Sequence, residues 1–229
     1  MIPLNRDALM IPRIAPLLLA LILSACSTAK EQSTQADDPI TDYGLDLLGL
    51  DDRFPDEASV RRQIGDTNVD RIDVPLGRGE VTLGTIIFPD DPARRLMMHW
   101  SEEKDYDKLE RVVIEKAGSR WYVRPGITPG IRLDSLERLN GGPFTMLGMD
   151  AYYSGQVENW NGGMIGDLES EGRYLVVRFL PSPEDLARLD DEQKRLILGE
   201  TEILSSHPTL QRLNPPVDVV MALYDRIGE

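Results

Sequence analysis

An apolar run at the N-terminus that closes on the only cysteine of the chain limits the possible folds more than any other feature. Residues 14–23 are apolar apart from Pro16, Arg6 and Arg13 precede them, and small residues lead into Cys26. This order is the pattern of a secretory signal peptide, and the run is shorter than the roughly 20 apolar residues that a membrane span needs. With Cys26 ending that segment, the folded part of the chain has no disulfide, no cysteine nucleophile and no zinc–thiolate site.

The four residues Leu23-Ser24-Ala25-Cys26 resemble the lipobox of bacterial lipoproteins. The resemblance implies cleavage before Cys26, lipidation of its sulfur by a diacylglycerol, and a further acyl chain such as palmitate on its amine. Several acyl chains hold a protein firmly on a membrane, whereas one chain binds reversibly. By the family's sorting rule, Ser27 in place of aspartate favours the outer membrane, and we expect the periplasmic face. An ordinary thiol that follows a hydrophobic segment by chance is the alternative.

Composition divides the chain into three parts. We expect a lipoprotein signal peptide at residues 1–25 and then, at 26–40, the lipidated cysteine with a flexible polar tether. Residues 41–229 have the length of one globular domain or of two small, closely packed modules. The apolar patch at 43–50 is predicted to dock on that domain.

The part of the chain after the signal peptide is strongly acidic. It keeps 23 basic and 38 acidic residues, a net charge of −15. Nucleic-acid binding depends on lysine and arginine at phosphates, so this charge argues against a nucleic-acid partner. The acidic cluster at 102–107 lacks the glycine and the distant glutamate of a calcium-binding loop, and we expect no metal and no cofactor.

The hydrophobic pattern alternates between short helical and strand-like segments. Helical spacing with end signals occurs at 55–65, 133–141 and 182–199. Strand-like segments, separated by turn residues, are found at 81–88, 95–100, 111–115, 120–123, 144–149, 152–163, 173–180 and 217–224. The absence of a strict strand–helix–strand alternation predicts an α+β fold with a mostly antiparallel sheet and short helices. The order of elements suggests two similar helix–sheet units, at about 55–123 and 124–225.

Two motifs in the second unit carry a further resemblance. They are Pro125-Gly126-Ile127 followed by Asn140-Gly141-Gly142-Pro143-Phe144, and Tyr153-Ser154-Gly155 followed by Trp160-Asn161-Gly162-Gly163. Over about residues 55–225 the chain resembles a family of uncharacterised bacterial envelope lipoproteins. More distantly, its helix and Gly-x-Pro stop are similar to the small outer-membrane assembly lipoproteins of the SmpA/OmlA type and to the beta-lactamase-inhibitor-like fold. That resemblance implies binding to other proteins through a sheet face or edge.

The aromatic and glycine-rich segment around 152–163 contains the best candidate binding surface. Its candidate residues are Tyr152, Tyr153, Trp160 and Asn161. Tyrosine and tryptophan can stack on a sugar or anchor a protein interface. The alternative is that this hairpin buries its aromatic side chains in the core, with one tyrosine of the adjacent pair inside and the other outside.

No sequence motif for catalysis is present. We expect His99 to lie in or beside the core, and His207 has no second histidine at a metal-binding distance. We therefore expect a non-enzymatic binding or assembly-accessory module with an envelope protein as partner. The alternative is a cell-wall or glycan hydrolase that uses two carboxylates, with Asp150, Glu158 and Asp167 as candidates.

Overall fold

The computed structural model describes residues 46–77, 80–101, 106–149, 155–169, 172–199 and 201–224. All of them belong to one compact unit, Asp37–Glu229. The predicted signal peptide, Cys26, the tether and Tyr152 and Tyr153 lie outside the described residues. Among the helices that are described, none has the length and apolar character that crossing a membrane requires.

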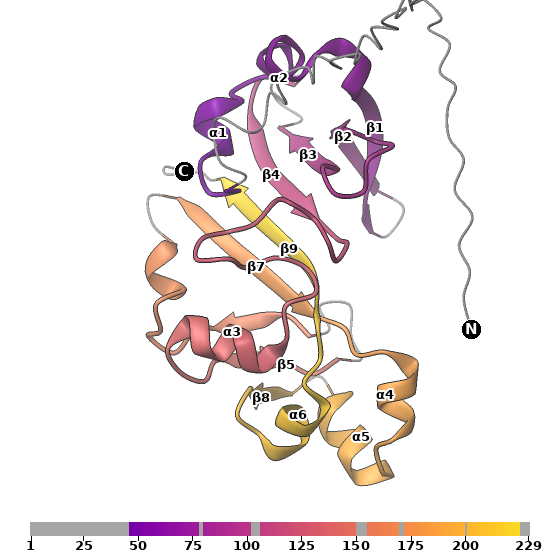
Figure 1. Ribbon diagram of the computed structural model, residues 1–229, viewed down its shortest axis with the longest axis vertical. Helices are drawn as coiled ribbons and strands as arrows, with labels where there is room; N and C mark the ends of the chain where they lie inside the picture. Colours follow the sequence, from indigo (N-terminus) through magenta and orange to yellow (C-terminus); the bar gives the residue numbers. More distant parts are fainter. Residues whose placement is uncertain are drawn as a thin grey trace, which may run out of the picture. The chain divides into compact units, whose positions relative to one another are not determined.

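A six-stranded antiparallel sheet forms the centre of this unit, in the strand order β1-β2-β3-β4-β9-β7 (Figure 1). Its strands are β1 (Val69–Gly77), β2 (Glu80–Ile87), β3 (Leu96–Trp100), β4 (Leu109–Ile114), β7 (Arg173–Phe179) and β9 (Val217–Tyr224). β9, the last strand of the chain, pairs with both β4 and β7. The two units suggested by the sequence therefore share one sheet.

Three short strands from the second half of the chain form a smaller sheet, in the order β6-β5-β8. Its strands are β5 (Thr145–Leu147), β6 (Val157–Asn159) and β8 (Glu202–Leu204). The helices are α1 (Leu50–Arg53), α2 (Glu57–Ile64), α3 (Leu133–Asn140), α4 (Pro183–Ala187), α5 (Asp191–Ile197) and α6 (Pro208–Leu213), with 3₁₀ turns η1 (Asp66–Asn68) and η2 (Gly166–Leu168). An isolated bridge between Gln156 and Arg178 links the smaller sheet to β7. The mixture of helices with mostly antiparallel strands confirms the predicted α+β fold.

One face of the large sheet carries the hydrophobic core. Alternate residues of each strand point to it: Leu96, Met98 and Trp100 on β3, Val112 and Ile114 on β4, Val220, Ala222 and Tyr224 on β9, and Leu175, Val177 and Phe179 on β7. The buried apolar residues of the helices, among them Leu50, Val60, Leu136, Ile197 and Leu210, belong to the same cluster. Burial of such side chains is the main favourable contribution to folding.

Capping residues set the ends of the predicted helices. Asp56 accepts a hydrogen bond from the Ser59 backbone N–H at the start of α2, and Gly65 ends that helix with a φ of 88°. Gly141 ends α3 in the left-handed conformation that glycine tolerates. Leu47 and Leu50, from the apolar patch at 43–50, are buried in the core.

The structure differs from the prediction at several elements. The helix expected over 182–199 is two helices, because Asp190 forms a capping box with Gln193 and starts α5 anew. Residues 120–123 make isolated bridges and no regular strand. α6 lies between the predicted segments 182–199 and 217–224, where no helix was expected, and β1 and β8 were not predicted either. β1 combines Asp70, Arg71 and Asp73 with Pro75, a composition typical of a protected edge strand and weak in the alternation that identifies inner strands.

Candidate functional site

Of the candidate residues at 152–163, the structure describes Trp160 and Asn161. Trp160 is only 6 % exposed and packs edge-on against Phe144, with 5.6 Å between ring centroids. Its ring therefore lies in the core and is not available to a partner. Burial of the aromatic side chains was the alternative to a binding surface for this hairpin. Asn161 is exposed at a turn with a φ of 53°, and its side-chain amide donates to the Pro143 carbonyl and to the Thr145 hydroxyl.

Asn140 explains why the Asn-Gly and Trp-Asn-Gly-Gly motifs occur together. Its side chain is buried and donates to the carbonyls of Gly142 and Trp160, while its oxygen accepts from the Ile165 N–H. A Cβ on Gly163 would lie 2.2 Å from the Asn140 side-chain oxygen, so only glycine fits there. The motifs that carry the family resemblance thus join the end of α3 to the turn after β6.

The second face of the large sheet is different in kind, and we call it the open face. Its apolar residues occupy alternate positions on the six strands, and one of those on β7 is a half-exposed tyrosine. They are Ile72, Val74, Ile86, Met97, Val113, Val219, Met221, Leu223, Val176 and Tyr174. None of them belongs to the core cluster or packs against it, whereas every buried apolar residue of the described helices does. Within the described part of the chain, the helices therefore cover only the opposite face.

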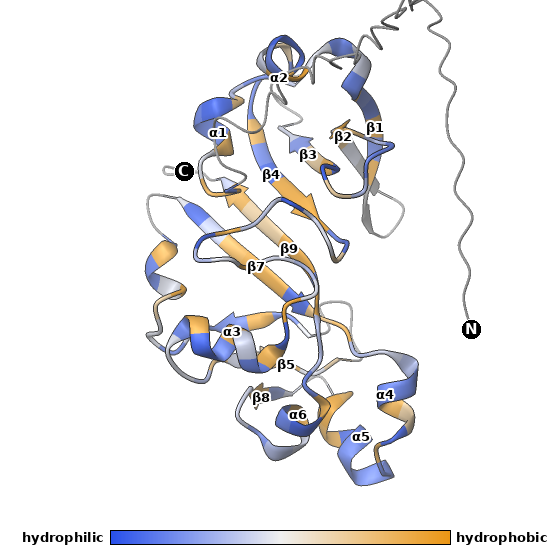
Figure 2. Ribbon diagram, viewed as in Figure 1, coloured by the Kyte–Doolittle hydropathy of each residue, from blue (hydrophilic) through white to orange (hydrophobic). Residues whose placement is uncertain are grey.

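The strand register aligns these side chains in a continuous row across the sheet. Ile86 lies opposite Met97, Met97 opposite Val113, Val113 opposite Met221, and Met221 opposite Val176. Side chains directly opposite one another on neighbouring strands have Cβ atoms roughly 5 Å apart and contact each other. Figure 2 shows the result on the ribbon, where β9 is hydrophobic along most of its length although only one of its faces meets the core.

On the open face, β1 and β2 are in close contact. A Cβ at Gly84 on β2 would lie 2.3 Å from a methyl group of Val74, so the Val74 side chain occupies the space above the glycine. Val74 and Ile86 are 7 % and 3 % exposed, and Val113 and Val219 are buried as well. The accessible part of the open face therefore consists of its half-buried residues and Tyr174.

His99 lies on the open face, one position along β3 from the row just described. It is 5 % exposed, and neither ring nitrogen has a hydrogen-bond partner among the described residues. Burial, together with the positive charge of Arg111 on the facing strand, lowers the pKa of the His99 imidazole to about 3. The ring is therefore uncharged at neutral pH, which agrees with the prediction that His99 packs in or beside apolar residues.

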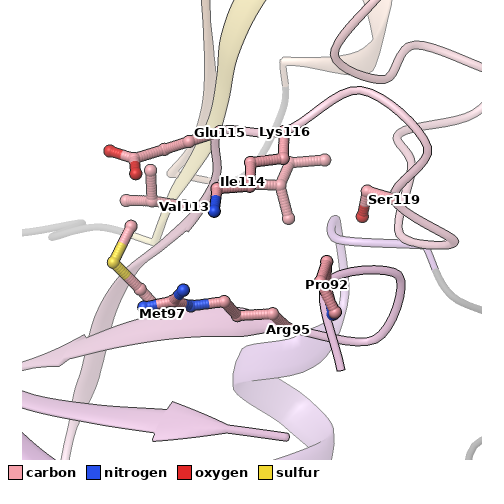
Figure 3. A pocket seen from close by; sticks show the side chains of 8 residues that line it. All are labelled: Pro92, Arg95, Met97, Val113, Ile114, Glu115, Lys116 and Ser119. Atoms are coloured by element: carbon pink, nitrogen blue, oxygen red, sulfur yellow. The ribbon is translucent and has the colours of Figure 1, made fainter. Parts of the chain in front are cut away.

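A pocket opens where β3 begins and β4 ends (Figure 3). It has a volume of about 270 Å³ and is lined by Pro92, Arg95, Met97, Val113, Ile114, Glu115, Lys116 and Ser119. Met97 and Val113 also belong to the apolar row, so the pocket is one end of the open face. Ser119 and Pro92 approach from the two turns, and Arg95 extends along the floor toward Met97 (Figure 3).

The charge of the pocket contrasts with that of the protein. Arg95 and Lys116 supply two positive charges and Glu115 one negative charge, in a chain whose formal net charge is −14. Neither Arg95 nor Lys116 forms an ion pair with another described residue. The pocket is thus a locally cationic site with an apolar floor.

The carboxylates proposed for a hydrolase do not form a site in the described residues. Glu158 is exposed on β6, Asp167 lies in η2, and Asp150 is outside the described residues. The pocket contains a single carboxylate, Glu115, and a second, more open hollow at the end of α5 is lined by Lys194, Arg195, Leu198 and Gly199. In the described part of the chain, no group of three histidine, cysteine or acidic side chains is placed to hold a metal ion.

Sequence reasoning missed the open face, although a signal for it was present. β9 reads Val-Asp-Val-Val-Met-Ala-Leu-Tyr and was predicted only as a buried strand. A strand that is apolar at both odd and even positions predicts apolar surface on both faces of its sheet. No protein-family model, curated protein or solved structure matches the chain.

Proposed function

We propose that this chain is a lipid-anchored protein of the bacterial envelope whose folded unit is a non-enzymatic binding or assembly-accessory module. The anchor rests on the lipobox-like residues that end at Cys26 and the location on Ser27. The binding role rests on one observation, the open face. Among the described residues of this face, Met97 and Met221 are half-buried and Tyr174 is 52 % exposed, and accessible apolar side chains of this kind on a sheet are typical of an interaction site.

The pocket at the end of this face favours binding over hydrolysis. Glycoside hydrolysis by paired carboxylates needs two such groups roughly 5–9.5 Å apart across the substrate. The pocket offers one, beside two cations and an apolar floor. These groups can hold a charged or amphiphilic molecule but supply no acid–base pair.

Photo-crosslinking in intact cells tests the proposal. A benzoylphenylalanine at Tyr174, which is 52 % exposed, or at Met221 would project from the open face. The same residue at Arg62, on the outer side of α2, is the matched control. We expect discrete adducts from positions 174 and 221 and none from 62, with unfolding temperatures close to that of the unsubstituted protein.

Equal labelling from all three positions, or none from the face, would contradict the proposed site. The anchor is tested separately by Cys26→Ser, which should move the protein from the membrane fraction to the soluble fraction and prevent labelling with palmitate. A variant that stays with the membrane and still incorporates palmitate would contradict the anchor.

A further inference from the structure

We propose that the open face binds a single-chain anionic lipid, with its acyl chain along the row from Met97 to Val176 and its head group in the pocket at Arg95 and Lys116. This inference rests on the proposed binding function and names its ligand. It joins two features, a cationic pocket and an apolar row, that share the side chains of Met97 and Val113.

The head-group end is defined by charge and size. Arg95 and Lys116 can each donate charge-assisted hydrogen bonds to a carboxylate or phosphate, and the Ser119 hydroxyl can add another. A volume of about 270 Å³ admits such a group but not a folded partner. The local excess of positive charge attracts an anion although the protein as a whole is strongly acidic.

The tail end is defined by the register. Met97, Val113, Met221 and Val176 lie on four neighbouring strands, β3, β4, β9 and β7. With about 4.8 Å between strands, the row is about 14 Å long, roughly the length of an extended chain of a dozen carbons. Met97, Met221 and Val176 are half-buried, so their surfaces are still available for contact. Methionine adapts well to flexible apolar ligands.

Two basic side chains border the row on one side. His99, in the next position along β3, is 5 % exposed and uncharged, so it brings no charge to the row. Arg111 lies beside it, and burial lowers the pKa of the Arg111 guanidinium. On the other side of the row, Arg178 on β7 forms an ion pair with Asp218 on β9, at 2.7 Å.

The charges at the end of the row decide between the possible occupants. A single acyl chain can lie along the row with its anionic head group at these charges, and each methylene that it buries raises affinity about fourfold. A partner protein would need an interface on the order of 800 Å² on this side. It would also have to cover the charges of Arg95, Glu115 and Lys116, which are placed at the end of the row.

Photolabelling of the full-length protein in its own membranes tests the inference. Membranes from producing cells are incubated with a diazirine-bearing hexadecanoic acid or with the corresponding hexadecanol, irradiated, and the adducts on the purified protein are mapped by mass spectrometry. We expect the acid to label peptides that contain Met97, Val113 or Met221, and the uncharged alcohol to label them about tenfold less.

Variants identify each end of the ligand. Arg95→Gln with Lys116→Gln should lower labelling by the acid about tenfold and leave the weak labelling by the alcohol unchanged, because only the head group loses its partners. Met221→Glu, which places a charge in the row, should prevent labelling by both probes. Arg62→Gln with Arg195→Gln removes the same charge from exposed helical positions and should change nothing.

The outcomes separate this inference from the proposed function. Equal labelling by acid and alcohol, or adducts outside the open face, would overturn the lipid assignment. If positions 174 and 221 crosslink to one discrete protein while neither probe labels the face, the binding function holds and the ligand is a protein.

Discussion

Replacement of Glu57 by glutamine should weaken the junction between α2 and the large sheet. Glu57 is 4 % exposed, and its carboxylate accepts hydrogen bonds from Arg71 at 2.6 and 2.9 Å, from Arg61 at 3.1 Å and from the Thr85 hydroxyl at 3.1 Å. Thr85 in turn accepts from the indole N–H of Trp100 at 2.8 Å. A neutral amide cannot accept from all of these donors and would turn its own N–H groups toward some of them.

The loss of stability depends on how well the hydrogen-bond partners of Glu57 can be solvated by water in the variant. Breaking a fully buried charge pair costs about 3–5 kcal/mol. The side chains of Arg71 and Arg61 are 58 % and 29 % exposed, so water recovers part of that cost. We therefore expect Glu57→Gln to lower the free energy of unfolding by about 2–3 kcal/mol. For a domain of this size that corresponds to a drop of roughly 5–10 °C in the unfolding temperature.

Chemical unfolding of the full chain, followed by circular dichroism and by tryptophan fluorescence, measures the effect. Asp66→Asn is the matched control, because Asp66 pairs with the same Arg61 at 3.5 Å but its side chain is 82 % exposed. The control should change the free energy of unfolding by less than about 0.5 kcal/mol. Equal losses in the two variants, or a loss below about 1 kcal/mol for Glu57→Gln, would refute the role of the buried network.

The same carboxylate makes the effect depend on pH. Burial by itself raises the pKa of Glu57, but the hydrogen bonds from Arg71, Arg61 and Thr85 and the charge of Arg61 outweigh burial and lower it below its ordinary value. A folded-state pKa below the unfolded one means that the stabilisation is fully present above about pH 4.3 and is lost as the pH falls through the folded-state pKa. The difference in stability between the unsubstituted protein and Glu57→Gln should therefore be constant near neutral pH and shrink below about pH 4.

Three further substitutions test the scaffold, each by thermal and chemical unfolding. Asn140→Ala should cost about 2–3 kcal/mol, because it leaves the Gly142 carbonyl and the Ile165 N–H without the Asn140 side chain and removes one of the two donors to the Trp160 carbonyl; a loss below about 1 kcal/mol would contradict the bridging role. Gly163→Ala should cost about 2 kcal/mol through the clash with Asn140, and the same change at Gly142, where nothing lies within 4 Å of a Cβ, should cost much less. Ser182→Ala should cost about 1 kcal/mol, because Ser182 accepts from the Asp185 N–H at the start of α4; no change would mean that water replaces this cap.

Most of the fold follows from local sequence signals. Asp56 and Gly65 mark α2, Gly141 ends α3, and Ser182 with Pro183 starts α4, as their residue types predict. The strands β2, β3, β4, β7 and β9 also match predicted segments, because their apolar residues repeat with the period of a strand. These elements are specified by neighbours in sequence, which is why one sequence suffices to find them.

The elements that were missed depend on contacts distant in sequence. β1 is an edge strand that pairs with β2 although its charged residues interrupt the apolar–polar alternation by which a strand is recognised in a sequence. β8 is three residues long and exists because Thr145 to Leu147 offers it a partner. The sharing of one sheet by both halves depends on β9 pairing with β4, more than 100 residues earlier in the chain. Neither spacing nor propensity contains this information.

The candidate site was missed for a related reason. Aromatic residues near glycines drew attention to Trp160, whose ring the structure places against Phe144 in the core. The residues of the open face, such as Met97, Val113 and Met221, are ordinary core residues by type. Only the topology shows that helices cover one face of the sheet and leave these side chains on the other.

The composition of the open face argues that its exposure is maintained and is not a defect of packing. Uncovered apolar sheet surface favours aggregation, and proteins restrain it with charges at its borders. Here Arg95, Glu115 and Lys116 stand at one end of the apolar row, and the Arg178–Asp218 pair stands beside the other. A face that needed only to be soluble could carry such charges along its middle, where Val113 and Met221 lie opposite each other. The row from Met97 to Val176 contains no charged residue, and Arg111, the cation of β4 on this face, lies beside the row opposite His99. An apolar row with charges around it is the arrangement that binding an amphiphile requires.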